Sequence, residues 1–437
     1  MNAPNHTATG VRPLSPDRRL LDAGSSNGTH PASSAGAVLG RQHHTVIGYD
    51  GLKRLALMVT PEGDGAFRDQ LWEVMSTIRA ILLEQAEPMT LTTQTVFLRD
   101  AADAEAATKL FEAYHGERMP LTVFVVQPPC DGKRLAIEAW AISTQSAQVD
   151  YVGPHLVTVS HDGLRWVHAS AGTLRQPEGS SFDQSAALFG QLASTLRGAG
   201  VPFEDVVRVW LYQGNITEPD AGIERYRELN RARTEFFAGV AFDELKLVPK
   251  CRGRTVYPAS TGIGTLEHGL TTTCMALQTN RNDVELLPLE NPLQTSSFDY
   301  PECYSIKSPK FSRAMAVRIG QHVTTWVSGT ASIVDSETVH VGDAAKQTDQ
   351  TLTNIEQLIA AENFARGGWQ DAGAELADLA KIRVYVKNPD DYEAVRGVCE
   401  QRLGEVPAIY AVADVCRPDL LVEIEGVAFS SLKGGAA

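Results

Sequence analysis

The sequence predicts an α+β fold of three tandem units, each a mixed sheet with two helices on one face. A pattern of strand, helix, strand, helix, strand, strand occurs three times along the 437 residues. Each copy spans roughly a hundred residues, a size at which one sheet and two helices can enclose a core. The total length also allows about three domains. The copies share a hydrophobic period and turn residues rather than sequence identity.

The first unit sets the pattern that the other two repeat. Its apolar and amphipathic runs predict strands at 54–60, 90–98, 121–127 and 134–142 and helices at 67–83 and 103–114. Before its last strand, Pro128 and Pro129 cannot donate to a ladder and Gly132 accepts a positive φ, so these residues predict a turn.

The second and third units follow the same order. The second has predicted strands at 164–172, 205–213, 255–260 and 271–278 and predicted helices at 183–197 and 222–237. The third has predicted strands at 324–333, 379–387, 409–415 and 420–429 and predicted helices at 344–361 and 390–403. We therefore expect a disordered tail at 1–40, units at 41–150, 151–285 and 311–437, and a linker at 286–310.

Composition excludes several classes of protein. The formal net charge is -14 and no basic block interrupts it, so we expect no nucleic-acid partner. No run approaches the roughly 18 apolar residues of a membrane span, and the first twenty residues lack the apolar core of a secretory signal. The sequence therefore predicts a cytoplasmic protein without a membrane partner.

Metal and phosphate-binding motifs are also absent from the sequence. Six cysteines are scattered without a CxxC spacing, so neither a metal site nor a disulfide framework is expected. Gly262-Ile263-Gly264 follows a predicted strand but precedes no helix, and we interpret it as a turn rather than a phosphate loop. We expect no cofactor.

Two carboxylates in the last predicted strand are the candidates for chemistry. Glu423 and Glu425 are two residues apart, so both project to one face of the strand. Burial on an apolar strand would raise a carboxyl pKa and make one of them a proton donor near neutral pH. The alternative is an edge strand with both acids in water.

Comparison of the units separates the two acids. In the first unit Glu138 aligns with Glu425, while Ala136 takes the place of Glu423. The second unit has only Thr or Cys at these places. We therefore predict that Glu138 and Glu425 are structural and that Glu423 is the catalytic residue.

Arginines and tyrosines supply candidates for binding an anion. Arg233 and Arg396 lie on equivalent predicted helices of the second and third units, and a planar guanidinium matches a carboxylate. The alternative is that helix arginines form solvated pairs with nearby glutamates. The aromatic segment 297–304 carries Tyr300 and Tyr304 and leads to Arg313, and we expect it to line a pocket.

Five segments in order carry a family resemblance: 224–227 with Arg233, 258–264, 308–314, 327–332 and 416–425. With them the chain resembles the chorismatases of the Rid superfamily (YjgF/YER057c/UK114), whose members are trimers with active sites between subunits. The resemblance implies three Rid-like (chorismate-mutase-like) units fused into a monomeric pseudo-trimer. It implies removal of the enolpyruvyl group of chorismate as pyruvate, giving a hydroxybenzoate, with 3-hydroxybenzoate favoured.

The resemblance also assigns roles to residues. It implies that Glu423 protonates the enolpyruvyl methylene and that Arg233 and Arg396 bind carboxylates, with Tyr300, Tyr304 and Arg313 as further substrate contacts. Gly329 and Cys416 match the subfamily that makes 3-hydroxybenzoate, whereas the subfamily that makes a dihydrodiol has a bulkier residue in place of the glycine.

The chain departs from this family in two places. Leu211 stands where the family has asparagine, and the first unit has no clear counterpart. Two other functions stay open: a non-catalytic Rid-like protein that binds a small molecule, and a Rid-type enamine or imine hydrolase. The hydrolase is disfavoured because Ile409 follows Pro407-Ala408, where that chemistry uses an arginine.

Overall fold

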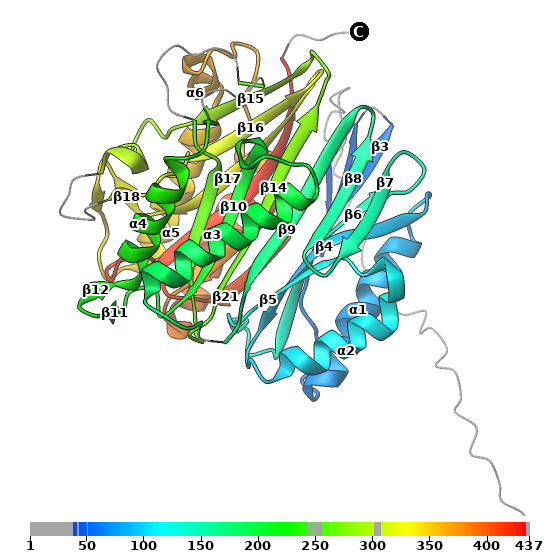
Figure 1. Cartoon of the computed structure of the whole chain (residues 1–437), viewed down its shortest axis with the longest axis horizontal. Helices are drawn as coiled ribbons and strands as arrows, with labels where there is room; N and C mark the ends of the chain where they lie inside the picture. Colours follow the sequence, from blue (N-terminus) through cyan, green and yellow to red (C-terminus); the bar gives the residue numbers. More distant parts are fainter. Residues whose placement is uncertain are drawn as a thin grey trace, which may run out of the picture. The chain divides into compact units, whose positions relative to one another are not determined.

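Three six-stranded sheets organise the chain, one for each repeated pattern of the sequence. The structure is a computed structural model that describes residues 38–41, 43–49, 51–175, 177–242, 247–248, 256–300 and 307–433. It confirms the mixed α+β class. From residue 38 onward the described residues belong to one compact unit (Figure 1). The predicted tail lies almost wholly outside the described residues.

The first sheet has the spatial order β1-β2-β3-β6-β4-β5. Its strands are β1 (Val38–Arg41), β2 (His44–Tyr49), β3 (Leu52–Val59), β4 (Met89–Leu98), β5 (Leu121–Val125) and β6 (Leu135–Ser143). Its helices are α1 (Phe67–Leu83) and α2 (Asp103–His115).

The second sheet, read from its hairpin, has the order β7-β8-β9-β14-β10-β13. Its strands are β7 (Gln148–Gly153), β8 (Leu156–His161), β9 (Leu164–Thr173), β10 (Val206–Gly214), β13 (Ala259–Thr265) and β14 (Leu270–Thr279). Its helices are α3 (Ser181–Gly198) and α4 (Arg225–Phe237), and β11 (Pro219–Asp220) and β12 (Ile223–Glu224) form a small ribbon before α4.

The third sheet has the order β15-β16-β17-β22-β20-β21. Its strands are β15 (Val284–Leu289), β16 (Ala314–Ile319), β17 (His322–Ala331), β20 (Leu379–Val386), β21 (Ala408–Val412) and β22 (Val422–Ser431). Its helices are α5 (Ala344–Ile359), α6 (Ala361–Arg366) and α7 (Tyr392–Leu403), and β18 (Ile333–Val334) pairs with β19 (Glu337–Thr338).

All three sheets therefore share one topology. Each starts with an antiparallel pair of strands and ends with one parallel pair, β4 with β5, β10 with β13, or β20 with β21. A parallel pair needs a crossover connection, and α2, α4 and α7 supply it. These three crossover helices stand in equivalent places, which matters for the site described below.

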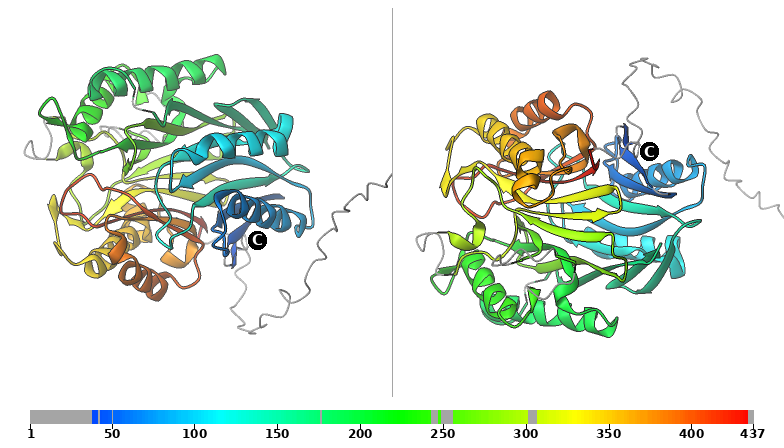
Figure 2. Two further views of the ribbon diagram at one scale, coloured as in Figure 1. Left: turned by 90° about the horizontal axis from the view of Figure 1, so that it is seen from below. Right: turned by 90° about the horizontal axis from the view of Figure 1, so that it is seen from above.

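Apolar periodicity decides which face each element buries. In α1 the buried Leu71, Val74 and Ile78 recur at helical spacing and pack on the first sheet. The other faces of the sheets turn toward one another: the ring centroids of Trp140 from β6 and Trp326 from β17 are 5.7 Å apart, and those of Trp210 from β10 and Trp326 are 6.1 Å apart. Figure 2 shows the helices of the second and third units (green and orange) outside, with strands between them.

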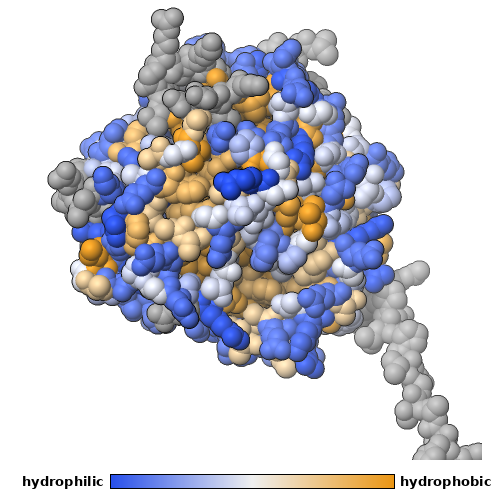
Figure 3. Space-filling model, viewed as in Figure 1, coloured by the Kyte–Doolittle hydropathy of each residue, from blue (hydrophilic) through white to orange (hydrophobic). Residues whose placement is uncertain are grey.

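Polar residues cover much of the outside. Figure 3 shows the face seen in Figure 1, where hydrophilic residues are spread over the surface with apolar residues between them. This is expected for amphipathic elements that bury one side. None of the described helices is long and apolar enough to cross a membrane.

Several predicted elements need correction. The turn predicted at 262–264 is wrong, because these residues lie in β13 and pair with β10. Glycine is needed there for close approach: a Cβ on Gly264 would lie 2.6 Å from the carbonyl oxygen of Asp414. The helix predicted at 344–361 is interrupted at Ala360, whose ψ of 149° is extended. Residues 286–289 belong to β15 rather than to a linker, and 301–306 lie outside the described residues.

Candidate active site

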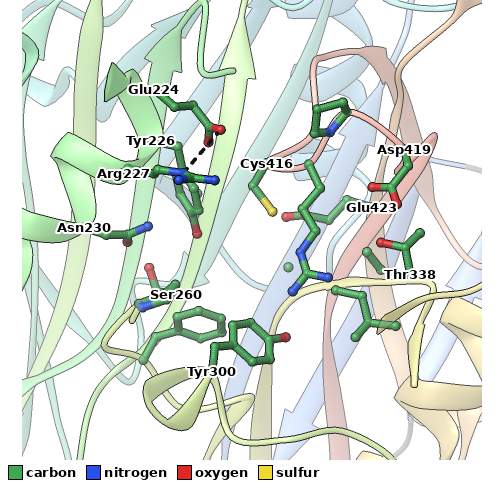
Figure 4. A pocket seen from close by; sticks show the side chains of 18 of the residues that line it. Glu224, Tyr226, Arg227, Asn230, Ser260, Tyr300, Thr338, Cys416, Asp419 and Glu423 are labelled. Carbon is green, nitrogen blue, oxygen red and sulfur yellow. Dashed lines mark ion pairs between the residues drawn. The ribbon is translucent and has the colours of Figure 1, made fainter. Parts of the chain in front are cut away.

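A cavity of about 380 Å³ opens between the second and third sheets (Figure 4). One wall comes from α4 and β13, and the other from the end of β17, the segment 416–419 and β22. Tyr300 and Arg313 close it from the segment that precedes β16. Its volume is in the range of small-molecule sites.

Glu423 lies in the wall of this cavity and is 4% exposed. β22 is a central strand between β17 and β20, so the alternative of an edge strand in water is wrong. Val422 and Ile424 point into the apolar core under the helices, and strand alternation turns Glu423 the other way. Burial, followed by the charge of Glu425, raises the pKa of Glu423 to about 8, against the opposing effect of Arg313 and Arg208. Glu423 therefore carries a proton at neutral pH and can donate it.

A bulge in β17 makes room for this carboxyl. The register between β17 and β22 shifts between Val327 and Thr330, and Gly329 lies in the shifted stretch. A Cβ on Gly329 would lie 2.0 Å from Glu423 Oε1, so any side chain there would displace the acid. The Gly329 amide donates to Thr261 Oγ1 at 3.0 Å, which ties the bulge to β13.

Cys416 lines the same cavity and lies beside Glu423 (Figure 4). Burial, with the nearby charge of Glu423, raises the pKa of the Cys416 thiol to about 12. The thiol is therefore neutral at physiological pH and is not an activated nucleophile.

Arg233 and Arg313 bring positive charge to the cavity. Arg233 Nη2 donates to Asn230 Oδ1 at 2.5 Å, and Arg313 Nη2 donates to the Tyr300 hydroxyl at 2.5 Å. Both guanidinium groups lie over the Phe311 ring, 5.6 and 5.4 Å from its centroid. Within the described part of the chain, the Nε atoms of both arginines are buried without a hydrogen-bond partner. The two arginines thus bring guanidinium groups, which match the planar geometry of a carboxylate, to the wall of the cavity.

Glu425 and Glu138 are engaged in ion pairs. Glu425 Oε2 lies 2.6 Å from Arg208 Nη2, and its Oε1 lies 3.1 Å from Arg383 Nη1. Glu138 pairs with Lys381 at 2.5 Å and also with Arg383. Both carboxylates are thus held in buried ion pairs, and neither lines the cavity.

Comparison with known proteins identifies the family. Residues 138–276 match the family model for chorismatase FkbO/Hyg5-like N-terminal domains, and residues 306–430 match the endoribonuclease L-PSP family. The chain is 34% identical over 300 residues to a 3-hydroxybenzoate synthase of Streptomyces hygroscopicus, covering 66% of this chain and 80% of that one. It is 36% identical over 276 residues to a chorismatase of Streptomyces rapamycinicus, covering 61% and 78%.

The chain belongs to the chorismatase family. A crystal structure of a chorismatase superposes with a TM-score of 0.62 at 23% identity, covering 86% of this chain and 98% of the other, which shows a shared fold. The second and third units lie within residues 151–437, which make up only about two thirds of the chain. A match that covers 86% of the chain must therefore extend into the first unit. The first unit thus has a counterpart in a chorismatase, contrary to the expectation from the sequence.

Arg396 does not line the cavity that holds Glu423. It lies on the exposed side of α7, pairs with Glu400 at 2.7 Å, and lines a separate cavity of about 770 Å³ beside β3 of the first sheet. The helix that faces Glu423 is α4, from the second unit, because the site lies between units rather than within the third. The sequence placed Arg233 and Arg396 on equivalent helices but did not show which helix meets β22.

Two further predicted residues have different outcomes. Tyr300 lines the cavity, and its ring lies under the guanidinium groups of Arg313 and Arg417 at 5.4 and 5.1 Å. Tyr304 lies outside the described residues. The family departure at Leu211 does not alter the cavity, because that side chain is buried in the helix-side core with Leu229.

The prediction from sequence missed Asn230 and Arg417 as lining residues. Arg417 lies in the family segment 416–425, directly after Cys416, but the sequence predicted no role for it. Asn230 lies one helical turn before Arg233, and residues so spaced share a helix face. Two features of the sequence could therefore have identified these residues: Arg417 is adjacent to Cys416, and Asn230 has helical spacing to Arg233.

Proposed function

We propose that this chorismatase converts chorismate into pyruvate and 3-hydroxybenzoate. The carrying observation is the buried carboxyl of Glu423, whose pKa is raised to about 8 by burial and by the charge of Glu425, in a cavity that Arg233 and Arg313 also line. Chorismate is a dianion with a vinyl ether, so it needs cations for its carboxylates and a proton for its terminal methylene carbon. The similarity to a 3-hydroxybenzoate synthase supports the choice of product.

In this mechanism Glu423 donates its proton to the methylene carbon of the enolpyruvyl group. The product is an oxocarbenium ion, and the new Glu423 carboxylate stabilises it. Arg233 and Arg313 hold the two carboxylates, and Tyr300 orients the ring hydroxyl. The neighbouring ring hydroxyl then attacks the ring carbon that carries the ether oxygen. That carbon–oxygen bond breaks, its electron pair forms the pyruvate carbonyl, and the hydroxyl proton returns to Glu423. Opening of the resulting epoxide with aromatisation gives 3-hydroxybenzoate without consuming water, whereas capture of the oxocarbenium ion by water would give a dihydrodiol.

We also propose that the three sheets are an intramolecular counterpart of a Rid trimer, with units at 41–150, 151–285 and 311–437. The shared strand order of the three sheets and the meeting of their inner faces support this arrangement. The monomeric state and the cytoplasmic location stay predictions. Light scattering on the purified chain would test the first, since a monomer must give a mass of 47.3 kDa.

The test of function is incubation of the purified protein with chorismate. We expect pyruvate release, followed by a coupled assay, and one aromatic product that co-elutes with 3-hydroxybenzoate rather than with its 2- and 4-isomers or the dihydrodiol. Glu423→Gln should lower kcat by about 10²- to 10⁴-fold, the usual contribution of a general acid, with an unchanged melting temperature. A ligand-induced rise in melting temperature without pyruvate would instead favour the non-catalytic binding protein.

A further inference from the structure

The residue beside the acid offers an inference that rests on the proposed function and deepens it. Glu425 lies two residues after Glu423 on β22, so both side chains project from the same face of the strand and their Cα atoms are about 7 Å apart. Glu425 is 2% exposed and does not line the cavity, so it does not touch the substrate. Its role must be exerted through another residue.

Glu425 is held by three strands. Arg208 and Trp210 of β10 donate to it, Arg208 Nη2 at 2.6 Å and Trp210 Nε1 at 3.0 Å. Tyr385 of β20 donates from its hydroxyl at 3.3 Å, beside Arg383. The Thr261 hydroxyl of β13 contacts it as well. Two ion pairs and these hydrogen bonds hold the Glu425 carboxylate in a fixed position.

Thr261 links this carboxylate to the bulge beside the acid. Its hydroxyl contacts Glu425 Oε2, receives a hydrogen bond from Arg208 Nη2 at 2.6 Å and accepts the Gly329 amide at 3.0 Å. Gly329 in turn leaves the space that Glu423 occupies. The position of Glu423 and the charge beside it are therefore set by one connected group.

We propose that Glu425 is a positioning residue for the reaction: its fixed negative charge makes Glu423 costly to ionise, so that the acid keeps its proton until the substrate takes it. Other charged or titratable groups face Glu423 from each neighbouring element: Arg313, Arg208, Tyr226 with Glu224, and Cys416 with Arg417. Of the charges that act on Glu423, that of Glu425 has the largest effect, and Arg313 and Arg208 oppose it.

The test is the pH profile of kcat in Glu425→Gln. Removing the charge lowers the pKa of Glu423, so the loss of activity with rising pH should begin about one to two pH units lower than in the wild type, the effect of a unit charge about 7 Å away at an effective dielectric constant of about 20. Glu425→Asp keeps the charge and should leave the alkaline limb in place. A lowered kcat with an unmoved limb in Glu425→Gln would reduce Glu425 to a structural role and overturn the proposal.

Glu138→Gln is the matched control. Glu138 occupies the aligned position on β6, is buried and pairs with two cations, but it does not act on Glu423. Its alkaline limb should coincide with that of the wild type. If Glu425→Gln fails to fold because Arg208 loses its partner, the double variant R208Q/E425Q removes both charges. The alkaline limb of the double variant should still lie at lower pH than that of the wild type, but the shift should be smaller than in Glu425→Gln. The reason is that Glu425 raises the pKa of Glu423 more than Arg208 lowers it.

A second readout separates this proposal from the proposed function. The infrared band of the protonated Glu423 carboxyl, identified by its loss in Glu423→Gln, reports ionisation without turnover. If the wild type releases no pyruvate, the proposed reaction fails, yet a lower titration midpoint of this band in Glu425→Gln would still support the pairing. An equal midpoint in both proteins would contradict it.

Discussion

At the scale of single residues, the protonated state of Glu423 ties activity to pH. Its pKa is raised to about 8 by burial and by Glu425, and only the protonated form can donate. We expect kcat to be constant below pH 7 and to fall about tenfold per pH unit above pH 8, as the acid ionises. Steady-state rates of pyruvate release between pH 6 and 9.5 measure this. A profile that falls toward acid instead would mean that Glu423 acts as a base.

Gly329 gives a second prediction at this scale. Gly329→Ala would place a methyl group 2.0 Å from Glu423 Oε1, and the carboxyl must move. A displacement of this size should lower kcat by about 10²-fold, because the donor no longer meets the reacting carbon. The matched control is Gly48→Ala on β2, where an added Cβ meets nothing within 4 Å. Equal rates in Gly329→Ala and the wild type would show that the carboxyl relaxes without cost.

At the scale of elements, sequence periodicity was a good guide where one face of a helix or strand is buried. The helix predicted at 67–83 agrees with α1 at both ends, since its apolar residues recur at helical spacing. The antiparallel strands that open each sheet were not predicted. β7 is one of them, and most of its residues are exposed, so it lacks a clear apolar alternation. The glycines of β13 were not predicted as strand residues, because what requires them is a close approach of segments distant in the sequence: Tyr226 of α4 to Gly262 and Asp414, after β21, to Gly264.

The contact between β13 and the segment at Asp414 can be tested directly. Gly264 N donates to the Asp414 carbonyl at 2.9 Å, and a Cβ on Gly264 would lie 2.6 Å from that same oxygen. Gly264→Ala should therefore lower the free energy of unfolding by about 1–3 kcal/mol, as overpacking does. Urea denaturation measures it. Gly190→Ala in α3, where the added Cβ meets nothing within 4 Å, should instead be neutral or slightly stabilising.

At the scale of the whole molecule, the site depends on how the units meet, and this the sequence could not show. Residues of one strand, such as Glu423 and Glu425, were found by alternation alone. Arg233 and Arg396 looked equivalent because α4 and α7 are equivalent in their own sheets. They differ only in the cavities they line: α4 lines one with the third sheet, whereas α7 lines one beside β3 of the first sheet. The first unit also meets the third through an ion pair: Glu138 of β6 contacts Lys381 and Arg383 of β20.

Glu138 joins the first sheet to the third and predicts how the molecule responds to acid. Burial opposes its charge, but Arg383 and Lys381 outweigh burial and lower the pKa of Glu138 to about 2. Because this folded-state pKa lies below the ordinary value of 4.5, the stabilisation is present above pH 4.5 and is lost as pH falls toward 2. Glu138→Gln leaves Lys381 without its carboxylate and Arg383 with only Glu425, and it should cost about 3–5 kcal/mol of unfolding free energy at pH 7. Urea midpoints at pH 7 and pH 3 test both statements: the difference between the wild type and Glu138→Gln must shrink at pH 3, and a constant difference would show that Glu138 contributes packing rather than charge.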